Sequence, residues 1–334
     1  MALIGTTQQW TFLIIFLLLL VILPYILRWT GNMNWLIFLN ITFITIIAVL
    51  GLNIITGMAG QISLGHSAFI MVGGYSLAVL TTKAHWPFWC ALPVAAVITG
   101  IIGLLVAAPA IRLKGFYVAV VTLAFFFVAQ YIVQSMEITG SFQGLMGIPQ
   151  PSIGGLKINS DTEWYYLLLI ITAVGVIASA NLLRSRLGRA FLAIRDNDIT
   201  AASLGISVPA TKLRAFFLGS LFAGVAGSLW TGYVTAIRLD QFTIWDSIWY
   251  VGMIIIGGAG STAGTVMGVT FLGLIRQILH VISMGPYLSS SISVALTHAV
   301  FGLVIILFIS FQPHGLISAW HKVKINYKRW PFGY

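Results

Sequence analysis

The stretch from Gly57 to Gly74 combines repeated glycines with the polar residues most capable of contacting a solute. In a membrane segment, glycines permit a helix break whose exposed backbone lines a cavity, and a polar side chain there marks a transport pathway by default. We therefore predict a substrate pathway that includes Gly60, Gln61, Ser63, His66 and Ser67. Close helix packing would also explain the glycines, and a neighbouring backbone carbonyl would equally satisfy His66.

A second candidate site is the basic segment 184–212. Five residues recur there at helical spacing: Ala190, Ile194, Asn197, Ala201 and Leu204. This spacing predicts one helix on the membrane surface, ended by Gly205. The run Arg195-Asp196-Asn197-Asp198 places acids beside a base, which favours a protein partner over an anionic lipid surface. The segment is the best surface on which a cytoplasmic ATPase could dock.

The chain lacks the motifs of common catalysts. An enzyme that hydrolyses ATP through a phosphate-binding loop needs G-x-x-x-x-G-K-[ST], and no lysine here follows a glycine. The six histidines are scattered, and neither a nucleophile elbow nor an H-E-x-x-H helix is present. We predict a transport subunit rather than an enzyme, with no metal site and no cofactor. The energy for active transport would come from another chain.

Ion-coupled transporters usually carry carboxylates within their spans. All seven acids of this chain fall in predicted loops or at span ends: Glu137, Asp161, Glu163, Asp196, Asp198, Asp240 and Asp246. This placement counts against ion coupling, although backbone carbonyls could still coordinate Na⁺. Arg276 and His280 share one helix face, where snorkelling or helix–helix bonding explains them better than substrate contact.

The composition shows what must position these residues. The 334-residue chain is 59% hydrophobic and only 7% charged, with a mean hydropathy of +1.01, whereas about a quarter of the residues of a soluble protein are charged. Such a chain cannot cover a globular surface with solvated side chains, which excludes a soluble enzyme and a disordered segment. Its net charge of +10 fits basic cytoplasmic loops better than nucleic-acid binding.

We therefore predict an all-α, polytopic membrane protein, with residues 1–334 forming a single permease domain. Its apolar stretches predict about ten transmembrane helices at 10–28, 34–56, 62–82, 86–111, 115–135, 164–183, 213–235, 244–259, 264–284 and 290–311. Gly224–Gly227 echoes Gly57–Gly60, a possible internal repeat. The glycine-rich segment 257–264 is interpreted as a tight turn, with a broken helix as the alternative.

The distribution of basic residues predicts the orientation. Most of the 17 Lys and Arg residues lie on one side if both termini are cytoplasmic. The opposite side then holds only Arg28, Lys83, Lys157 and Arg238. Segment 136–163 is then an external loop, 184–212 a cytoplasmic coupling loop and 312–334 a basic cytoplasmic tail. Arg28 alone would reverse the first span, so the direction of that span stays open.

Five segments carry a specific combination of motifs in a fixed order. They read GLNIITGMAGQISLGHSAFIMVGGY (51–75), RLKGFYVAVVTLAF (112–125), TGSFQGLMGIP (139–149), GRAFLAIRDNDITAASLGISVPATKLRAFFLGSLFAGVAGSLW (188–230) and GGAGSTAGTVMG (257–268). Together they resemble the LivM-type permease, the membrane subunit of high-affinity branched-chain amino-acid ABC importers. The resemblance runs from about residue 35 to residue 311.

The resemblance implies an ATP-driven importer of Leu, Ile or Val in a bacterial plasma membrane. Its expected partners are a sister permease in a heterodimer, two cytoplasmic ATPase subunits and an external substrate-binding protein. Segment 188–205 matches the family's ATPase-contacting loop. The resemblance therefore gives a coupling role to Gly188, Arg189, Ala193, Arg195, Asp196, Asn197, Ala201 and Gly205.

One motif departs from the family pattern. Segment 139–149 carries Ser141 and Gln143 where the family commonly reads T-G-G-x-x-G. Urea or a short amide therefore stays open as the substrate. A stand-alone secondary carrier is the alternative to an ABC permease, with segment 184–212 acting only as a membrane-surface helix.

Overall fold

The computed structural model describes residues 20–29, 31, 33–111, 113, 115–153, 156–283, 290–312 and 315–329. Within the predicted first span, the described part belongs to the helix Leu20–Trp29. The rest of that span and both chain ends lie outside the described residues.

Every predicted span from 34–56 to 290–311 coincides with a helix, so the all-α prediction is confirmed. The long helices are α2 (Met33–Leu52), α3 (His66–Thr82), α4 (Phe88–Ala110), α5 (Phe116–Ser135), α6 (Asp161–Arg184), α9 (Val208–Val234), α10 (Ile244–Gly257), α11 (Thr262–Ser283) and α12 (Ser290–Phe311). Helix α13 (Gly315–Arg329) occupies much of the predicted basic tail. Among the described helices, six are long and apolar enough to cross a membrane. Helix length therefore does not establish the predicted count of about ten.

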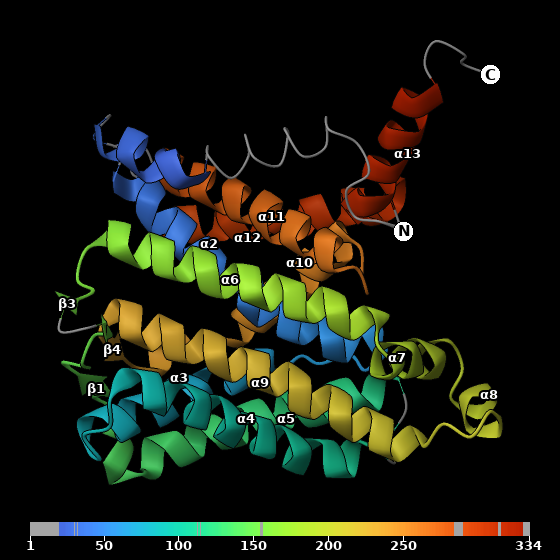
Figure 1. Ribbon diagram of the computed structural model, residues 1–334, viewed down its shortest axis with the longest axis horizontal. Helices are drawn as coiled ribbons and strands as arrows, with labels where there is room; N and C mark the ends of the chain where they lie inside the picture. Colours follow the sequence, from blue (N-terminus) through green and yellow to red (C-terminus); the bar gives the residue numbers. More distant parts are fainter. Residues whose placement is uncertain are drawn as a thin grey trace.

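The helices run side by side, and different short elements gather at the two ends of the bundle (Figure 1). One end carries α7 (Arg186–Asp196) and α8 (Asp198–Ser203). The other end carries the 3₁₀ helices Glu137–Thr139 and Leu239–Gln241 and the strands β1 (Leu145–Met146), β2 (Ser152–Ile153), β3 (Leu156–Lys157) and β4 (Ala236–Ile237). Strand β1 pairs antiparallel with β4, and β2 with β3. The predicted external and coupling loops thus lie at opposite ends.

Two helices begin before the apolar spans predicted for them. Helix α6 begins at Asp161, inside the predicted loop 136–163, because Ser160 and Glu163 form a reciprocal capping box. Helix α9 begins at Val208, five residues before the predicted span, with Pro209 in its first turn. Proline suits that position because its missing N–H needs no partner there.

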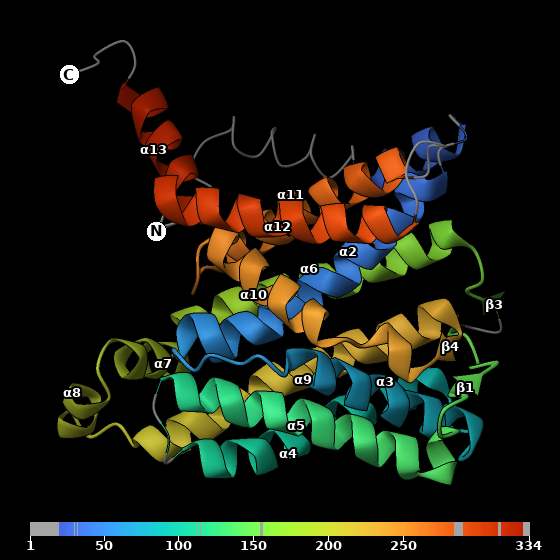
Figure 2. The same ribbon diagram turned by 180° about the vertical axis from the view of Figure 1, so that it is seen from behind.

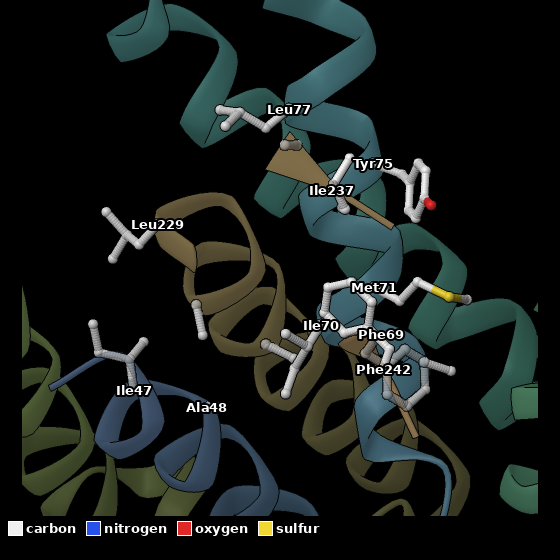
Figure 3. Close-up of a cluster of buried hydrophobic side chains, with 14 of the residues drawn as sticks. Ile47, Ala48, Phe69, Ile70, Met71, Tyr75, Leu77, Leu229, Ile237 and Phe242 are labelled. Carbon is white, nitrogen blue, oxygen red and sulfur yellow. The ribbon is translucent and has the colours of Figure 1, made fainter. Parts of the chain in front are cut away.

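Helix α9 forms the centre of the bundle and packs against α2, α3 and α4. Side chains from α2, α3 and α9, with Ile237 of β4 and Phe242, gather in one buried apolar cluster (Figure 3). Helices α11 and α12 lie on the far side of α2 from α4 and α5, and α10 crosses α2 and reaches α3 (Figure 2). The tetrads Gly57–Gly60 and Gly224–Gly227 have different structures: the first ends a helix and the second lies within α9. The predicted repeat is therefore not a repeated local structure here.

Replacing Gly227 by alanine should destabilise the bundle. A Cβ atom on Gly227 would overlap the carbonyl oxygen of Ile70 in α3, so α3 and α9 would have to separate. Overpacking of this kind costs about 1–3 kcal/mol, which should lower the melting temperature of the purified chain in detergent. Gly302→Ala in α12 is the matched control, because a Cβ there meets no atom within 4 Å. Equal melting temperatures for the two variants would contradict the packing argument.

Candidate functional site

The chain is broken between α2 and α3, which is one of the two interpretations that the glycines of this stretch allowed. Helix α2 continues into a π-helix from Asn53 to Met58, and residues 59–65 are not helical before α3 begins at His66. Gly60 has a φ of +69°, a backbone conformation that side-chain-bearing residues rarely adopt. The π-helix at this break contacts α7, so the break lies at the end of the bundle that carries α7.

The protein around them satisfies some of the predicted pathway residues only in part. The fully buried His66 lies with Nε2 2.8 Å from the carbonyl oxygen of Ala48, while its Nδ1 has no partner among the described residues. The Ser67 hydroxyl lies 2.8 Å from that of Ser247, and Gln61 Nε2 donates to the Ala59 carbonyl at 3.2 Å. The buried Ser63 hydroxyl has no partner among the described residues. Gly60 and Gln61 border a hollow of about 330 Å³ that Arg195, Asp196 and Asn197 also line. Their contact with a solute stays a prediction.

The coupling segment is two helices instead of the predicted one. Asn197 has extended backbone angles and separates α7 from α8. Its Oδ1 accepts hydrogen bonds from the backbone N–H groups of Ile199 and Thr200 at 2.9 and 3.1 Å, so it is the N-cap of α8. Asparagine is among the preferred residues at that position. The helical spacing across Asn197 was misleading because a capping side chain interrupts it.

Arg195 faces the membrane-embedded helices. Its Nη1 donates to the carbonyl oxygen of Gly57 in the π-helix, and also to that of Ala259 at 3.4 Å. Asn53 joins the same two segments, since its Oδ1 accepts from Gly260 N at 2.9 Å. One guanidinium group therefore connects α7 to the broken end of α2 and to the α10–α11 connection.

Two glycines make room for Arg195. A Cβ atom on Gly60 would lie 3.1 Å from Arg195 Cγ, and one on Gly260 would lie 2.5 Å from Nη1. Gly260 has a φ of +85° within the short connection between α10 and α11. Segment 257–264 is therefore a tight turn packed against α7, as interpreted from the sequence, and not a broken helix.

The other predicted coupling residues divide between structural and exposed positions. Gly188 is buried in α7, and a Cβ there would overlap the Leu182 carbonyl. Arg189 Nη1 donates to the Arg184 carbonyl at 3.0 Å. Ala201 is buried, Ala193 is half-buried, and Asp196 and Gly205 are exposed. Two apolar side chains of this segment that sequence reasoning left out of the site, Ile199 and Leu204, are 74% and 75% exposed.

A cavity of about 550 Å³ lies between α2, α9, α10 and α11; we call it the α10–α11 cavity. None of the predicted pathway residues lines it. Its polar lining consists of Asn34, Thr42, Thr45, Trp230, Gln241, Asp246, Tyr250, Arg276 and Gln277. Its apolar lining includes Ile44, Ala48, Ile70, Trp249, Met253 and Val269. The size suits a small organic solute, since ligand pockets range from about 300 to 1,000 Å³.

Asp246 and Arg276 are the charged residues that sequence reasoning missed as site residues. Asp246 was assigned to a span end, but it lies in the first turn of α10, where it forms a capping box with Thr243. Asp246, Trp249, Tyr250 and Met253 recur at i, i+3, i+4 and i+7, so they share one face of α10. That spacing was the available signal.

The comparisons with known proteins identify the family. The family model described as "Branched-chain amino acid transport system / permease component" matches residues 34–309. This chain is a member of that permease family. It is 30% identical to the high-affinity branched-chain amino acid transport system permease protein LivM of Salmonella typhimurium, and equally to that of Escherichia coli. Each alignment covers 82% of this chain and 69% of the relative. The probable LivM of Methanocaldococcus jannaschii is 24% identical over 68% of this chain and 67% of its own length.

The family resemblance inferred from the five motifs is therefore confirmed, as is the prediction of a transport subunit rather than an enzyme. No solved structure is significantly similar to the permease. The motif at 139–149 departs from the family pattern only in a turn between the 3₁₀ helix Glu137–Thr139 and β1: Ser141 has a φ of +49° and Gln143 is exposed. Neither residue lines the α10–α11 cavity.

Proposed function

We propose that this chain is the membrane permease subunit of an ATP-driven importer of branched-chain amino acids. Its family membership supports the transport role, and the printed names of its LivM relatives support the substrate class. The remaining elements of the importer are a sister permease of similar fold, two cytoplasmic ATPase subunits and an external binding protein. The complex resides in the bacterial plasma membrane, with both termini of this chain cytoplasmic.

The observation that carries the coupling part of this proposal is the contact of Arg195 with Gly57 and Ala259. A partner that moves α7 pulls directly on the two places where the membrane helices are interrupted. Helix interruptions are where packed helices can change direction at low cost. A displacement of α7 by the ATPase subunits would therefore reach α2, α3, α10 and α11 together.

Leucine uptake into proteoliposomes tests the function. The permease, reconstituted with its sister permease, ATPase subunits and binding protein, should accumulate radiolabelled leucine only with ATP inside the cytoplasmic compartment. Urea should not be accumulated. Uptake of urea but not leucine would show that the substrate is urea and not a branched-chain amino acid. Leucine uptake by the permease alone, without ATPase subunits, would identify a stand-alone carrier.

The exposed apolar side chains of the coupling segment should contact the ATPase. We expect Ile199→Ser with Leu204→Ser to reduce recovery of the ATPase subunits with the tagged permease by about tenfold, because buried interface anchors cost about 1–2 kcal/mol when truncated. Phe142→Ser is the control, since Phe142 is 73% exposed at the opposite end of the bundle. Unchanged recovery with the double variant would contradict docking at α8.

A further inference from the structure

We propose that the α10–α11 cavity holds the transported amino acid, with its ammonium group on Asp246, its carboxylate on Arg276 and its apolar side chain deeper between α2, α10 and α11. This inference rests on the proposed import function and assigns it a binding site.

On both α10 and α11, the charged residue that lines the cavity lies toward one end of the bundle and the apolar residues lie toward the other end. Helix α10 runs toward the α7 end and presents Asp246 before Met253. Helix α11 starts at that end and presents Val269 before Arg276. Along α2, polar Asn34 precedes apolar Ala48, and α2 also ends near α7. The charged groups therefore lie toward the β1–β4 end, and the part of the cavity nearer α7 is apolar.

Neither charge at the polar end forms an ion pair among the described residues. Asp246 Oδ2 accepts from Thr243 N at 2.9 Å and from Thr243 Oγ1 at 2.7 Å, while Oδ1 accepts from no described residue. Arg276 forms no ion pair within the described ranges. Its guanidinium lies 5.6 Å from the centre of the Trp249 ring, a contact that leaves its N–H donors available. Both residues line the same cavity, together with Tyr250, one turn after Asp246.

Asp246 is half-buried and Arg276 is exposed, so both charged groups are accessible to a solute that enters the cavity. An ammonium group complements a carboxylate, and a carboxylate complements the donor fork of an arginine. A ligand with both groups on one carbon and an aliphatic tail matches the cavity from its polar to its apolar end. That chemistry is a zwitterionic amino acid with an apolar side chain.

Direct leucine binding tests this assignment. The full permease complex in nanodiscs, without the external binding protein, is titrated with radiolabelled leucine in a scintillation proximity assay. Asp246→Asn and Arg276→Gln should each weaken saturable leucine binding by about tenfold or more, because each removes a charged hydrogen-bond partner. Asp240→Asn and Arg238→Gln are matched controls: they pair with each other at 3.3 Å, are largely exposed and lie outside the cavity.

Two leucine analogues separate recognition from damage to the fold. Competition with 4-methylpentanoate, which lacks the ammonium group, should lose little affinity in Asp246→Asn, because the interaction that the variant removes is already absent. Competition with 3-methylbutylamine, which lacks the carboxylate, should likewise be insensitive to Arg276→Gln. Such non-additivity between side chain and ligand group is the signature of a direct contact.

Equal losses for leucine and both analogues would overturn the proposal, as would the absence of saturable leucine binding to the unmodified complex. A phospholipid that co-purifies with the unmodified permease and is lost from Arg276→Gln, with leucine affinity unchanged, would overturn it in favour of a lipid site. The leucine uptake assay tests the proposed function independently of the binding measurements. A complex that transports leucine with normal rates in both variants retains the proposed function and refutes this binding site.

Discussion

Replacing Arg195 by methionine is expected to uncouple the permease from its ATPase. Methionine keeps a long, unbranched side chain, but the two hydrogen bonds that Arg195 donates to the Gly57 and Ala259 carbonyls disappear. Hydrogen bonds to charged groups contribute about 1.5–3 kcal/mol each, and the lower end applies here because Arg195 is an exposed residue and its bond to Ala259 is 3.4 Å long. A loss near 3 kcal/mol in the transition state of the transport step lowers its rate by about a hundredfold. We therefore expect leucine uptake to fall by about a hundredfold while ATP hydrolysis continues.

The measurement is the ratio of leucine transported to ATP hydrolysed in proteoliposomes. Arg195→Lys should give an intermediate ratio, since a single ammonium group reaches fewer carbonyls than a guanidinium fork. Arg186→Met, at the exposed first turn of the same helix, is the control for changes of charge on α7. A normal ratio in Arg195→Met would refute transmission through this contact. Equal loss of uptake and of ATPase recovery would assign Arg195 to docking instead.

Replacing Lys212 by methionine is expected to destabilise the coupling segment. Lys212 in the first turns of α9 is 3% exposed, and its Nζ donates to Asp198 Oδ2 at 2.9 Å. Removing one partner of a buried ion pair costs about 3–5 kcal/mol, because the other charge stays buried and unpaired. Asp198 is 21% exposed, so the lower end of that range applies. Helix α8, which Asp198 begins, should lose its attachment to α9.

Limited proteolysis with a protease of broad specificity reports this loss. Cleavage between residues 197 and 207 should become much faster in Lys212→Met than in the unmodified chain. Adding Asp198→Asn should recover part of the protection, since the unpaired carboxylate is then removed. Arg238→Met breaks an exposed ion pair at the other end and should change the melting temperature little. Equal protection in Lys212→Met and the unmodified chain would show that the pair does not hold α8.

Local chemistry in the sequence predicted the helices well and their ends less well. An apolar chain in lipid must satisfy each backbone polar group internally, so long apolar stretches fold as helices. The ends depend on single side chains. Ser160 and Glu163 started α6 earlier than hydropathy predicted, and Asn197 divided the coupling segment. These caps are visible in the sequence, but the same residues occur in loops and exposed turns, so their type alone does not place a boundary.

By itself, the sequence determined the membrane class, the helices and the family, and it left alternatives open for the glycine-rich stretches after Gly57 and at 257–264. Only the tertiary structure decided which way Arg195 points, because its partner Gly57 lies 138 positions away in the chain. The same holds for Asp246 and Arg276, which lie on different helices and meet at one cavity. Spacing along a chain reports which residues share a face of one helix. The packing of the whole bundle determines which other helix contacts that face. The sites of this permease depend on such contacts between helices that are distant in the sequence.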